Sequence, residues 1–335
     1  MPTIQDVARA AGVSTATVSR VLSNPEVVSA DRQSRVMAAV ERLGYERNFA
    51  AKSLRTAQSK KIVVTVPDIS NPFFSSIIRG IENAAHSYGY AVLLGDTRHE
   101  PEREELYATM VRRKEADGLI FLGHRLPTTL SDLVEKLGFR APVVNGCEFS
   151  PSLGVCSAHI DNAAAAAEAI AYLYSLGHER IGVITGPLAS PLSRDRLTGA
   201  RSSAAAHGKE DGLTVATGDF SVECGEREAL LLLTSERAPS AIFCFSDEMA
   251  IGAMAAARHL RLRCPEDFSL IGFDDIRYAR YLSPALTTVG QPMQAIGRES
   301  VRLLVNILKG KQNSPASVTL PHTLIVRAST RSLSE

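Results

Sequence analysis

The side chains with the clearest chemistry near the start of the sequence lie on a short helix predicted over residues 15–22. Val18, Val21 and Leu22 recur at helical spacing and form its buried face. The opposite face carries small side chains and one arginine: Thr15, Ala16, Thr17 and Arg20. Small hydroxyls fit against DNA phosphates, and an arginine in the major groove bonds guanine O6 and N7. A solvated face in an ordinary helical bundle has the same pattern, and this alternative stays open on the pattern alone.

Two further helices are predicted around this one. Thr3 and Asp6 have capping-box spacing and start a helix that Gly12 ends. Ser14 then caps the helix with the polar face, and a third helix begins after Ser29. Two short helices joined by a glycine-containing turn and supported by a third predict a helix-turn-helix unit.

The distribution of charge agrees with a nucleic-acid partner for this unit. The net charge of the 335 residues is only +1, but residues 1–61 hold ten Lys or Arg against five Asp or Glu. The rest of the chain is mildly acidic. A basic head on an acidic body indicates that the head binds a polyanion, although small domains also drift by several charges without purpose.

The segment IQDVARAAGVSTATVSRVLSNPEVVSADRQSRVMAAVERLGY resembles the DNA-binding head of the LacI family without a gap, and its VSTATVSRVL core is specific to that family. The resemblance implies a bacterial transcriptional repressor that binds operator DNA. By position, Thr15, Ala16 and Arg20 are the expected base contacts. The expected phosphate contacts are Thr3, Ser14, Thr17, Ser19 and Asn24.

The next segment, NFAAKSLRT at residues 48–56, is too short to hold a helix by itself in water. The resemblance implies a hinge that becomes helical when two copies meet in the minor groove, with Asn48 and Ala51 among its DNA contacts. Leu54 occupies the position at which the family inserts a leucine between base pairs. A flexible linker, with Leu54 packed on its own domain, is the alternative.

Apolar runs alternate with helical segments from residue 60 onward. Four of these runs are IVVTVPDI, DGLIFLG, RIGVITG and FSLIGFDD. Continuous apolar strands between helices predict parallel sheets covered on both faces. Two such series predict an α/β body of two doubly wound lobes, with ligand at the carboxyl ends of the strands.

The body resembles the periplasmic sugar-binding fold that LacI-family repressors use as a sensor, on motifs such as SNPFFSSIIRGIE, HIDN, RLTGAR, FSDEMAIGAM and LTTVGQP. The expected domains are 1–47 for DNA binding, 48–59 for the hinge and linker, and 60–335 for effector binding and dimerisation. Within the body, we expect one lobe at about 60–160 and 291–322. The other lobe is expected at about 161–290 and 323–335.

The resemblance places the effector between the lobes. Asp274 and Arg196 match the family's carboxylate and arginine that hold the ligand, and such a pair binds a polar ring well. Phe73, Phe74 and Phe220 match positions that stack on the ligand, although a core role for one of them, Phe74 first, is equally compatible. The remaining expected effector residues are Asn71, Glu148, Ser246 and Gln291. Asp274 as a turn cap, with Arg196 solvated, is the structural alternative.

Within the family, VPDISNPFFSSIIRGIE, LLGD, LGHRLP, CEFSP and GDF resemble the nucleoside-responsive (cytidine) repressor subgroup. A nucleoside effector is therefore expected, with its ribose near Asp274 and Arg196. The hinge departs from that subgroup because this chain keeps the AAKSL-type helix. A sugar, a sugar acid or a purine base is the alternative effector.

Other classes of protein fit the sequence less well. A solute-binding transport protein would account for the body but not for the head, and the N-terminus does not read as a secretion signal. The GxSxG, P-loop, HExxH and strand-following GxGxxG motifs of enzymes are missing, and we expect no cofactor or metal. Five scattered cysteines indicate free thiols in the cytoplasm, where a repressor would be associated with the nucleoid. No leucine heptad follows Ala328, which favours a dimer over a tetramer.

Overall fold

The computed structural model describes residues 2–46 and 58–333. The chain divides into a head that ends at Gln58 and a body that begins at Ser59. The backbone N–H of Ser59 and that of Lys60 both donate to the carboxylate of Asp117, at 2.6 and 3.0 Å. These bonds fix the start of the body against its first sheet.

The head is a three-helix unit built on local signals. Its helices are α1 (Ile4–Ala11), α2 (Thr15–Ser23) and α3 (Ala30–Leu43), with a 3₁₀ turn at Pro25–Val27. Thr3 and Asp6 form the capping box predicted from their spacing, and Gly12 ends α1 in the left-handed conformation that glycine adopts without strain. One small core joins the helices: Val7, Ala8, Ala11, Val18, Val21, Val36 and Ala39.

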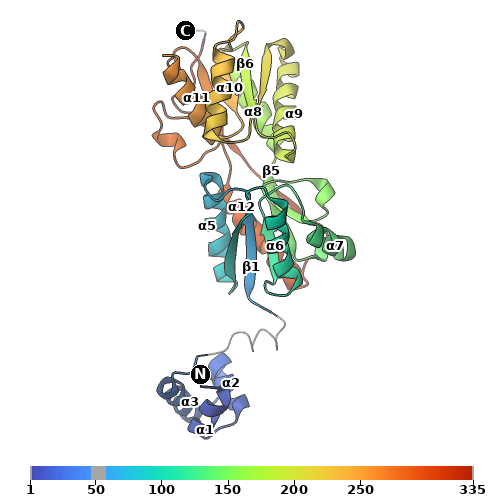
Figure 1. Ribbon diagram of the computed structural model, residues 1–335, viewed down its shortest axis with the longest axis vertical. Helices are drawn as coiled ribbons and strands as arrows, with labels where there is room; N and C mark the ends of the chain where they lie inside the picture. The colour runs from blue at the N-terminus through green and yellow to red at the C-terminus, as the bar shows by residue number, and fades with distance from the viewer. Residues whose placement is uncertain (1, 47–57, 334–335) are drawn as a thin grey trace. The chain divides into compact units, whose positions relative to one another are not determined.

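The body has two α/β lobes, each with a six-stranded sheet among the described residues (Figure 1). The first sheet has the order β11-β5-β4-β3-β1-β2, with every pairing parallel. Its strands are β1 (Lys61–Val66), β2 (Ala91–Asp96), β3 (Gly118–Phe121), β4 (Val143–Gly146), β5 (Cys156–Ile160) and β11 (Ser317–Leu320). Its helices are α5 (Pro72–Ser87), α6 (Pro101–Arg112), α7 (Thr128–Leu137) and α12 (Met293–Leu308).

The second sheet has the order β12-β10-β9-β8-β6-β7, in which only β12 runs antiparallel to its neighbour. Its strands are β6 (Ile181–Thr185), β7 (Leu213–Thr217), β8 (Ala241–Cys244), β9 (Ser269–Asp274), β10 (Thr287–Gly290) and β12 (Thr323–Ile325). Its helices are α8 (Asn162–Ser175), α9 (Pro191–Ala206), α10 (Val222–Leu233) and α11 (Asp247–His259). The two doubly wound parallel-sheet lobes predicted from the alternation of apolar runs and helices are confirmed.

Helices cover both faces of each sheet, and this explains the continuous apolar strands. In β1, Ile62 and Val64 belong to one core cluster, whereas Val63 between them belongs to another under α6 and α7. On the first face α5 and α12 approach closely, because a side chain at Gly80 would meet the Gln294 backbone at 2.3 Å. Burial on both faces therefore requires apolar residues at every position of the strand.

The chain passes between the lobes three times along the described part of the body. It leaves the first lobe after β5, returns to it after β10, and leaves it again between β11 and β12. Strand ends and crossing segments therefore meet where the two lobes face each other. The parallel strands of both lobes present their carboxyl ends there, which is the usual position for a ligand in this class of fold.

Candidate functional site

The outer face of α2 is arranged as a nucleic-acid contact surface. Ser14 caps the helix by accepting a hydrogen bond from the backbone N–H of Thr17 at 3.2 Å. Val18 and Val21 are buried in the head, which leaves the side chains of Thr15, Ala16 and Arg20 exposed: the three residues expected to contact bases.

The residues expected to contact phosphates lie at helix caps or along α2: Thr3 and Ser14 are N-caps, Asn24 is a C-cap, and Thr17 and Ser19 lie within the helix. Thr3 uses its hydroxyl within the capping box of α1, and Asn24 is the exposed C-cap of α2. Both positions are compatible with a phosphate contact. The three hinge positions, Asn48, Ala51 and Leu54, lie outside the described residues, so their DNA contacts stay predictions from the sequence.

Three of the expected effector residues meet where the lobes face each other. Asp274 ends β9, and its Oδ1 accepts a hydrogen bond of 2.7 Å from Nε2 of Gln291, which follows β10. Arg196 projects from α9 and places Nη2 4.0 Å from Asp274 Oδ1. All three side chains are buried. Burial raises the pKa of Asp274 to about 7, although the charge of Arg196 acts in the opposite direction.

Arg196 is held firmly in this buried position. Its Nε donates to Asn162 Oδ1 at 2.9 Å, its Nη1 donates to the carbonyl oxygen of Phe245, and its guanidinium lies 3.5 Å from the centre of the Phe273 ring. Burial lowers the pKa of Arg196 to about 10, so the group is still a cation near neutral pH. A fixed, desolvated guanidinium of this kind suits recognition of a polar ligand group.

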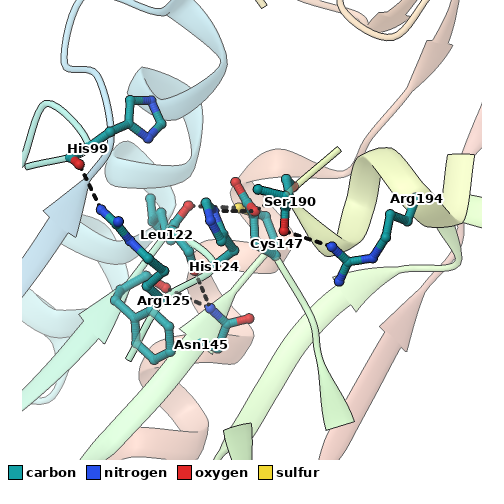
Figure 2. A network of polar contacts seen from close by, with 12 residues as sticks. His99, Leu122, His124, Arg125, Asn145, Cys147, Ser190 and Arg194 are labelled. Carbon is teal, nitrogen blue, oxygen red and sulfur yellow. Dashed lines mark hydrogen bonds and ion pairs between the residues drawn. The ribbon is translucent and has the colours of Figure 1, made fainter. Parts of the chain in front are cut away.

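Glu148 belongs to the first lobe and connects it to the second. Its Oε2 accepts a hydrogen bond of 2.8 Å from Ser190 Oγ and lies 3.5 Å from Nδ1 of His124. Ser190 is the N-cap residue of α9 but makes no side-chain bond to that helix. Figure 2 shows His124, from the first lobe, and Ser190, from the second, close to this contact. Buried Cys147 lies beside it and donates its thiol to the carbonyl oxygen of Leu122 at 3.6 Å (Figure 2).

The three candidate aromatic residues occupy different surroundings. Phe73 and Phe74 are buried at the start of α5 and pack edge to face with ring centres 5.1 Å apart. Both belong to the main core, so they shape the first lobe whether or not they reach a ligand. Phe220 is only half-buried and lies against Gly186, where an added Cβ would be 2.0 Å from its ring. Phe220 is therefore the most exposed of the three rings, although it also packs against the main core.

Two other candidates cap helices with their side chains. Asn71 accepts from the Phe73 backbone at the start of α5, and Ser246 accepts from the Met249 backbone at the start of α11. Asp161 does the same at the start of α8, accepting from the Ala164 backbone. These contacts explain each residue type without a ligand.

The structure adds residues that the sequence did not single out. Ser193 lies one helical turn before Arg196, and its buried Oγ has no hydrogen-bond partner. Asp247 is fully buried and accepts from Thr288 Oγ1 at 2.6 Å and from the Ile276 backbone at 2.8 Å. Burial raises the pKa of Asp247 well above its usual range. Asp247 thus anchors the loop that carries Asp274.

A separate hollow of about 290 Å³ lies in the first lobe, between α6 and the loop before α7. Three of its charged groups have partners, because Glu104 lies 3.1 Å from Arg125 and Glu105 accepts from the Thr129 backbone, while Glu102 is exposed to solvent. It therefore has a structural explanation in the packing of two helices. Among residues 2–46 and 58–333, we find no cluster of metal-binding side chains and no helix long and apolar enough to cross a membrane.

The head and the two-lobed body together define a class of protein: a DNA-binding regulator with a ligand-sensing domain. Comparison with known proteins identifies the family. Residues 3–48 match the model for bacterial regulatory proteins of the lacI family, and residues 170–330 match a periplasmic binding protein-like domain. The chain is 42% identical to the HTH-type transcriptional repressor CytR of Escherichia coli K12, over 99% of this chain and 97% of that one.

Solved structures agree with this family. The Lac repressor dimer bound to operator and the anti-inducer ONPF superposes with a TM-score of 0.88 at 28% identity, covering 98% of this chain and 99% of that one. The complex of the transcriptional regulator CelR with cellobiose gives a TM-score of 0.72 at 30% identity, covering 98% and 100%. The chain belongs to the LacI family and is a ligand-responsive, DNA-binding transcriptional repressor, as the sequence predicted.

Proposed function

We propose that this repressor responds to a nucleoside bound between its two lobes. The observation that carries the proposal is the buried group of Arg196, Asp274 and Gln291 at the meeting point of the lobes. A carboxylate accepts hydrogen bonds from the hydroxyls of ribose, and the guanidinium donates to its oxygens. The 42% identity to CytR and the resemblance to nucleoside-responsive repressors support a nucleoside over other ligands.

The remaining residues of the proposed site are assigned roles as follows. Phe220 offers a half-exposed ring for the base, and Glu148 lies at the connection between the lobes. Phe73 and Phe74 form the apolar wall of the first lobe, while Asn71 and Ser246 hold the starts of α5 and α11. Aromatic faces and a small number of fixed polar groups are the usual composition of such a site.

We propose that effector binding changes the closure of the lobes and, through it, the affinity for operator DNA. In a homodimer, a shift between paired first lobes changes the spacing of the two hinges at residues 48–59. Thr15, Ala16 and Arg20 are the proposed base contacts in the major groove, with Leu54 in the minor groove. The operator complex and dimer of the Lac repressor support this arrangement. The same family relationship supports a cytoplasmic, nucleoid-associated regulator without catalytic activity.

A sugar effector is the second candidate. The observation that favours it is the structural similarity to CelR, whose complex contains cellobiose. Asp274 and Arg196 suit sugar hydroxyls as well as those of ribose, so the base-stacking ring of Phe220 is the part of the site that distinguishes the two. The repressor architecture is the same in both cases.

Thermal stabilisation of the purified protein tests the effector. The compounds are cytidine, adenosine, adenine, ribose, cellobiose and gluconate as a sugar acid. A ligand at 100 times its dissociation constant stabilises the folded state by about 2.7 kcal/mol, which raises Tm measurably. A shift with cytidine or adenosine supports the nucleoside. A shift only with adenine, a sugar or the sugar acid would replace the nucleoside and keep the repressor.

A further inference from the structure

Side chains of the effector site or its neighbour contact each segment that crosses between the lobes or the helix or strand that it leads into. The crossings follow β5 and β10 and lie between β11 and β12. Each of these contacts joins residues that are far apart in the sequence. The lobes can move relative to one another only if these segments change conformation. Any closure of the lobes would therefore affect the three contacts.

The first crossing is contacted by Arg196. Its Nε donates to Oδ1 of Asn162 at 2.9 Å, and Asn162 is the first residue of α8, directly after the crossing. Asn162 is buried, so this bond is shielded from bulk solvent. If a ligand displaces the guanidinium, this hydrogen bond should move the start of α8 with it.

The second crossing is contacted by Asp274. Gln291 is the first residue after β10, and its Nε2 donates to Asp274 Oδ1 at 2.7 Å. Its backbone N–H also donates to the Asp274 carbonyl oxygen at 3.3 Å. The carboxylate proposed to accept the ligand hydroxyl is thus attached to the segment that returns to the first lobe.

The third crossing leads into β12, and the residue next to Asp274 contacts the chain just beyond that strand. Arg327 lies two residues after β12, and its Nη2 is 2.6 Å from Asp275 Oδ1. Its Nη1 also donates to the Leu286 carbonyl oxygen at 2.8 Å. Both charged side chains are mostly buried, 15% and 18% exposed, which strengthens the pair relative to a surface ion pair.

The dipeptide that carries these contacts is held in an unfavourable backbone conformation. Asp274 and Asp275 have φ angles of 112° and 56°, both in the region that favours glycine. Such a conformation persists only where its surroundings impose it, and it is often found at ligand-binding positions. Here it turns one carboxylate toward Gln291 and the next toward Arg327.

We propose that Asn162 and Arg327 are positioning residues that transmit effector binding at Arg196 and Asp274 to the lobe crossings, and so to the operator response. The inference rests on the proposed effector site but not on the identity of the effector. Neither residue needs to touch the ligand. Their loss should therefore reduce the response of DNA binding to effector more than it reduces effector affinity.

The test separates these two quantities in the full-length protein. Cytidine, adenine and ribose are each titrated by calorimetry, and operator affinity is measured with and without each compound on a duplex selected by the wild-type protein from a randomised pool. A coupling of about 5- to 150-fold is typical for such a switch. Arg327→Met and Asn162→Leu should reduce this ratio to less than about 2-fold while effector affinity changes by less than about 5-fold.

Conservative variants and a matched control complete the design. Asn162→Asp keeps the acceptor oxygen and should keep the response, and Arg327→Lys should restore part of it. Arg302→Ala removes an arginine from an exposed ion pair with Glu299 on α12 and should leave both quantities unchanged. If Arg327→Met does not fold, Asp275→Asn removes the same ion pair without introducing an apolar group.

The outcomes are distinct. Variants that bind the compound and keep the wild-type ratio overturn the proposal. So do variants whose effector affinity falls as far as that of Asp274→Asn, because they would then belong to the binding site itself. If the wild type responds only to ribose, the nucleoside proposal is rejected. The variants are then compared with ribose as the effector. A wild type that binds none of the three compounds rejects the nucleoside, and the ratio is then measured with cellobiose and gluconate. A wild type that binds none of the five compounds removes the effector site and the inference with it.

Discussion

Nη2 of Arg196 lies 4.0 Å from Oδ1 of Asp274, and both side chains are almost fully buried. This separation is too long for a hydrogen bond, so the two charges attract each other without direct contact. Each group is held by other partners instead: Asn162 and the Phe245 carbonyl for the arginine, and Gln291 for the carboxylate. A ligand hydroxyl that bonds to both would complete an interaction that the protein leaves incomplete.

The raised pKa of Asp274 predicts a pH-dependent stability. The carboxyl group has a pKa of about 7 in the folded protein and 3.8 as the reference value. The folded state therefore binds more protons between these values, and the resulting stabilisation is complete below pH 3.8 and lost as pH rises through about 7. From pH 5 to pH 8, the free energy of unfolding should fall by about 2–3 kcal/mol relative to Asp274→Asn, measured by urea denaturation. Parallel profiles for the two proteins would assign the pH dependence to other groups.

Effector affinity should change in the opposite direction over the same range. An ionised carboxylate accepts hydroxyl hydrogen bonds better than a protonated one, so the affinity for cytidine should rise roughly tenfold from pH 6 to pH 8. Calorimetry at several pH values measures this dependence. Asp274→Asn should bind weakly and show a flat profile, and a flat profile in the wild type would remove Asp274 from the site.

The unpartnered hydroxyl of Ser193 predicts that its removal has opposite effects on protein stability and on effector affinity. Its hydroxyl is buried without a partner one turn from Arg196, so an effector contact there would satisfy it. Ser193→Ala should leave the protein equally or more stable, because a buried unsatisfied hydroxyl is unfavourable. Affinity for the effector should fall about 3- to 10-fold, the value of one hydrogen bond. Ser203→Ala, a buried serine farther along α9, is the control, and equal affinities for both variants would exclude Ser193 from ligand binding.

The position of the Phe220 ring predicts the effect of a single methyl group. A Cβ at Gly186 would lie 2.0 Å from the ring, so Gly186→Ala must displace Phe220. If the ring stacks on the base, nucleoside affinity should fall about 3- to 10-fold while ribose affinity changes little. Gly123→Ala adds the same methyl group with its nearest contact at 3.7 Å and should be neutral. An unchanged cytidine affinity in Gly186→Ala would argue against stacking by Phe220.

The head could be predicted in detail because its signals are local. Thr3 and Asp6 are three residues apart and cap the same helix, and Gly12 ends that helix immediately afterwards. The lobes were predictable for a related reason: strands buried on both faces must be apolar along their length, and this pattern is visible in segments such as residues 62–66. Local geometry and burial thus determine most of the fold.

The contacts within the effector site are harder to predict from the sequence than the fold is. Asp274 and Arg196 were recognised by resemblance, but their bonds to Gln291 and Asn162 join residues 17 and 34 positions apart. The partner of Asp275, Arg327, is 52 positions away. Such pairs depend on how helices and strands pack in three dimensions, and no periodic pattern records them. The unpartnered hydroxyl of Ser193 depends on the positions of all the polar atoms around it, which the sequence does not record.

Arg20 provides the sharpest test of the head. Its side chain is exposed on α2, so Arg20→Ala should not reduce the stability of the three-helix unit. If Arg20 bonds to a guanine, the substitution should cost about 1–3 kcal/mol of discrimination at one base pair of the operator and leave the other positions unaffected. Binding to duplexes with single base-pair changes measures this directly.

Arg42→Ala removes the same charge from α3, where Arg42 is also exposed, and should preserve the ranking of the duplexes. A uniform loss across all duplexes for Arg20→Ala, with a smaller dependence on salt, would show that Arg20 contacts phosphate and that the sequence is read by other residues.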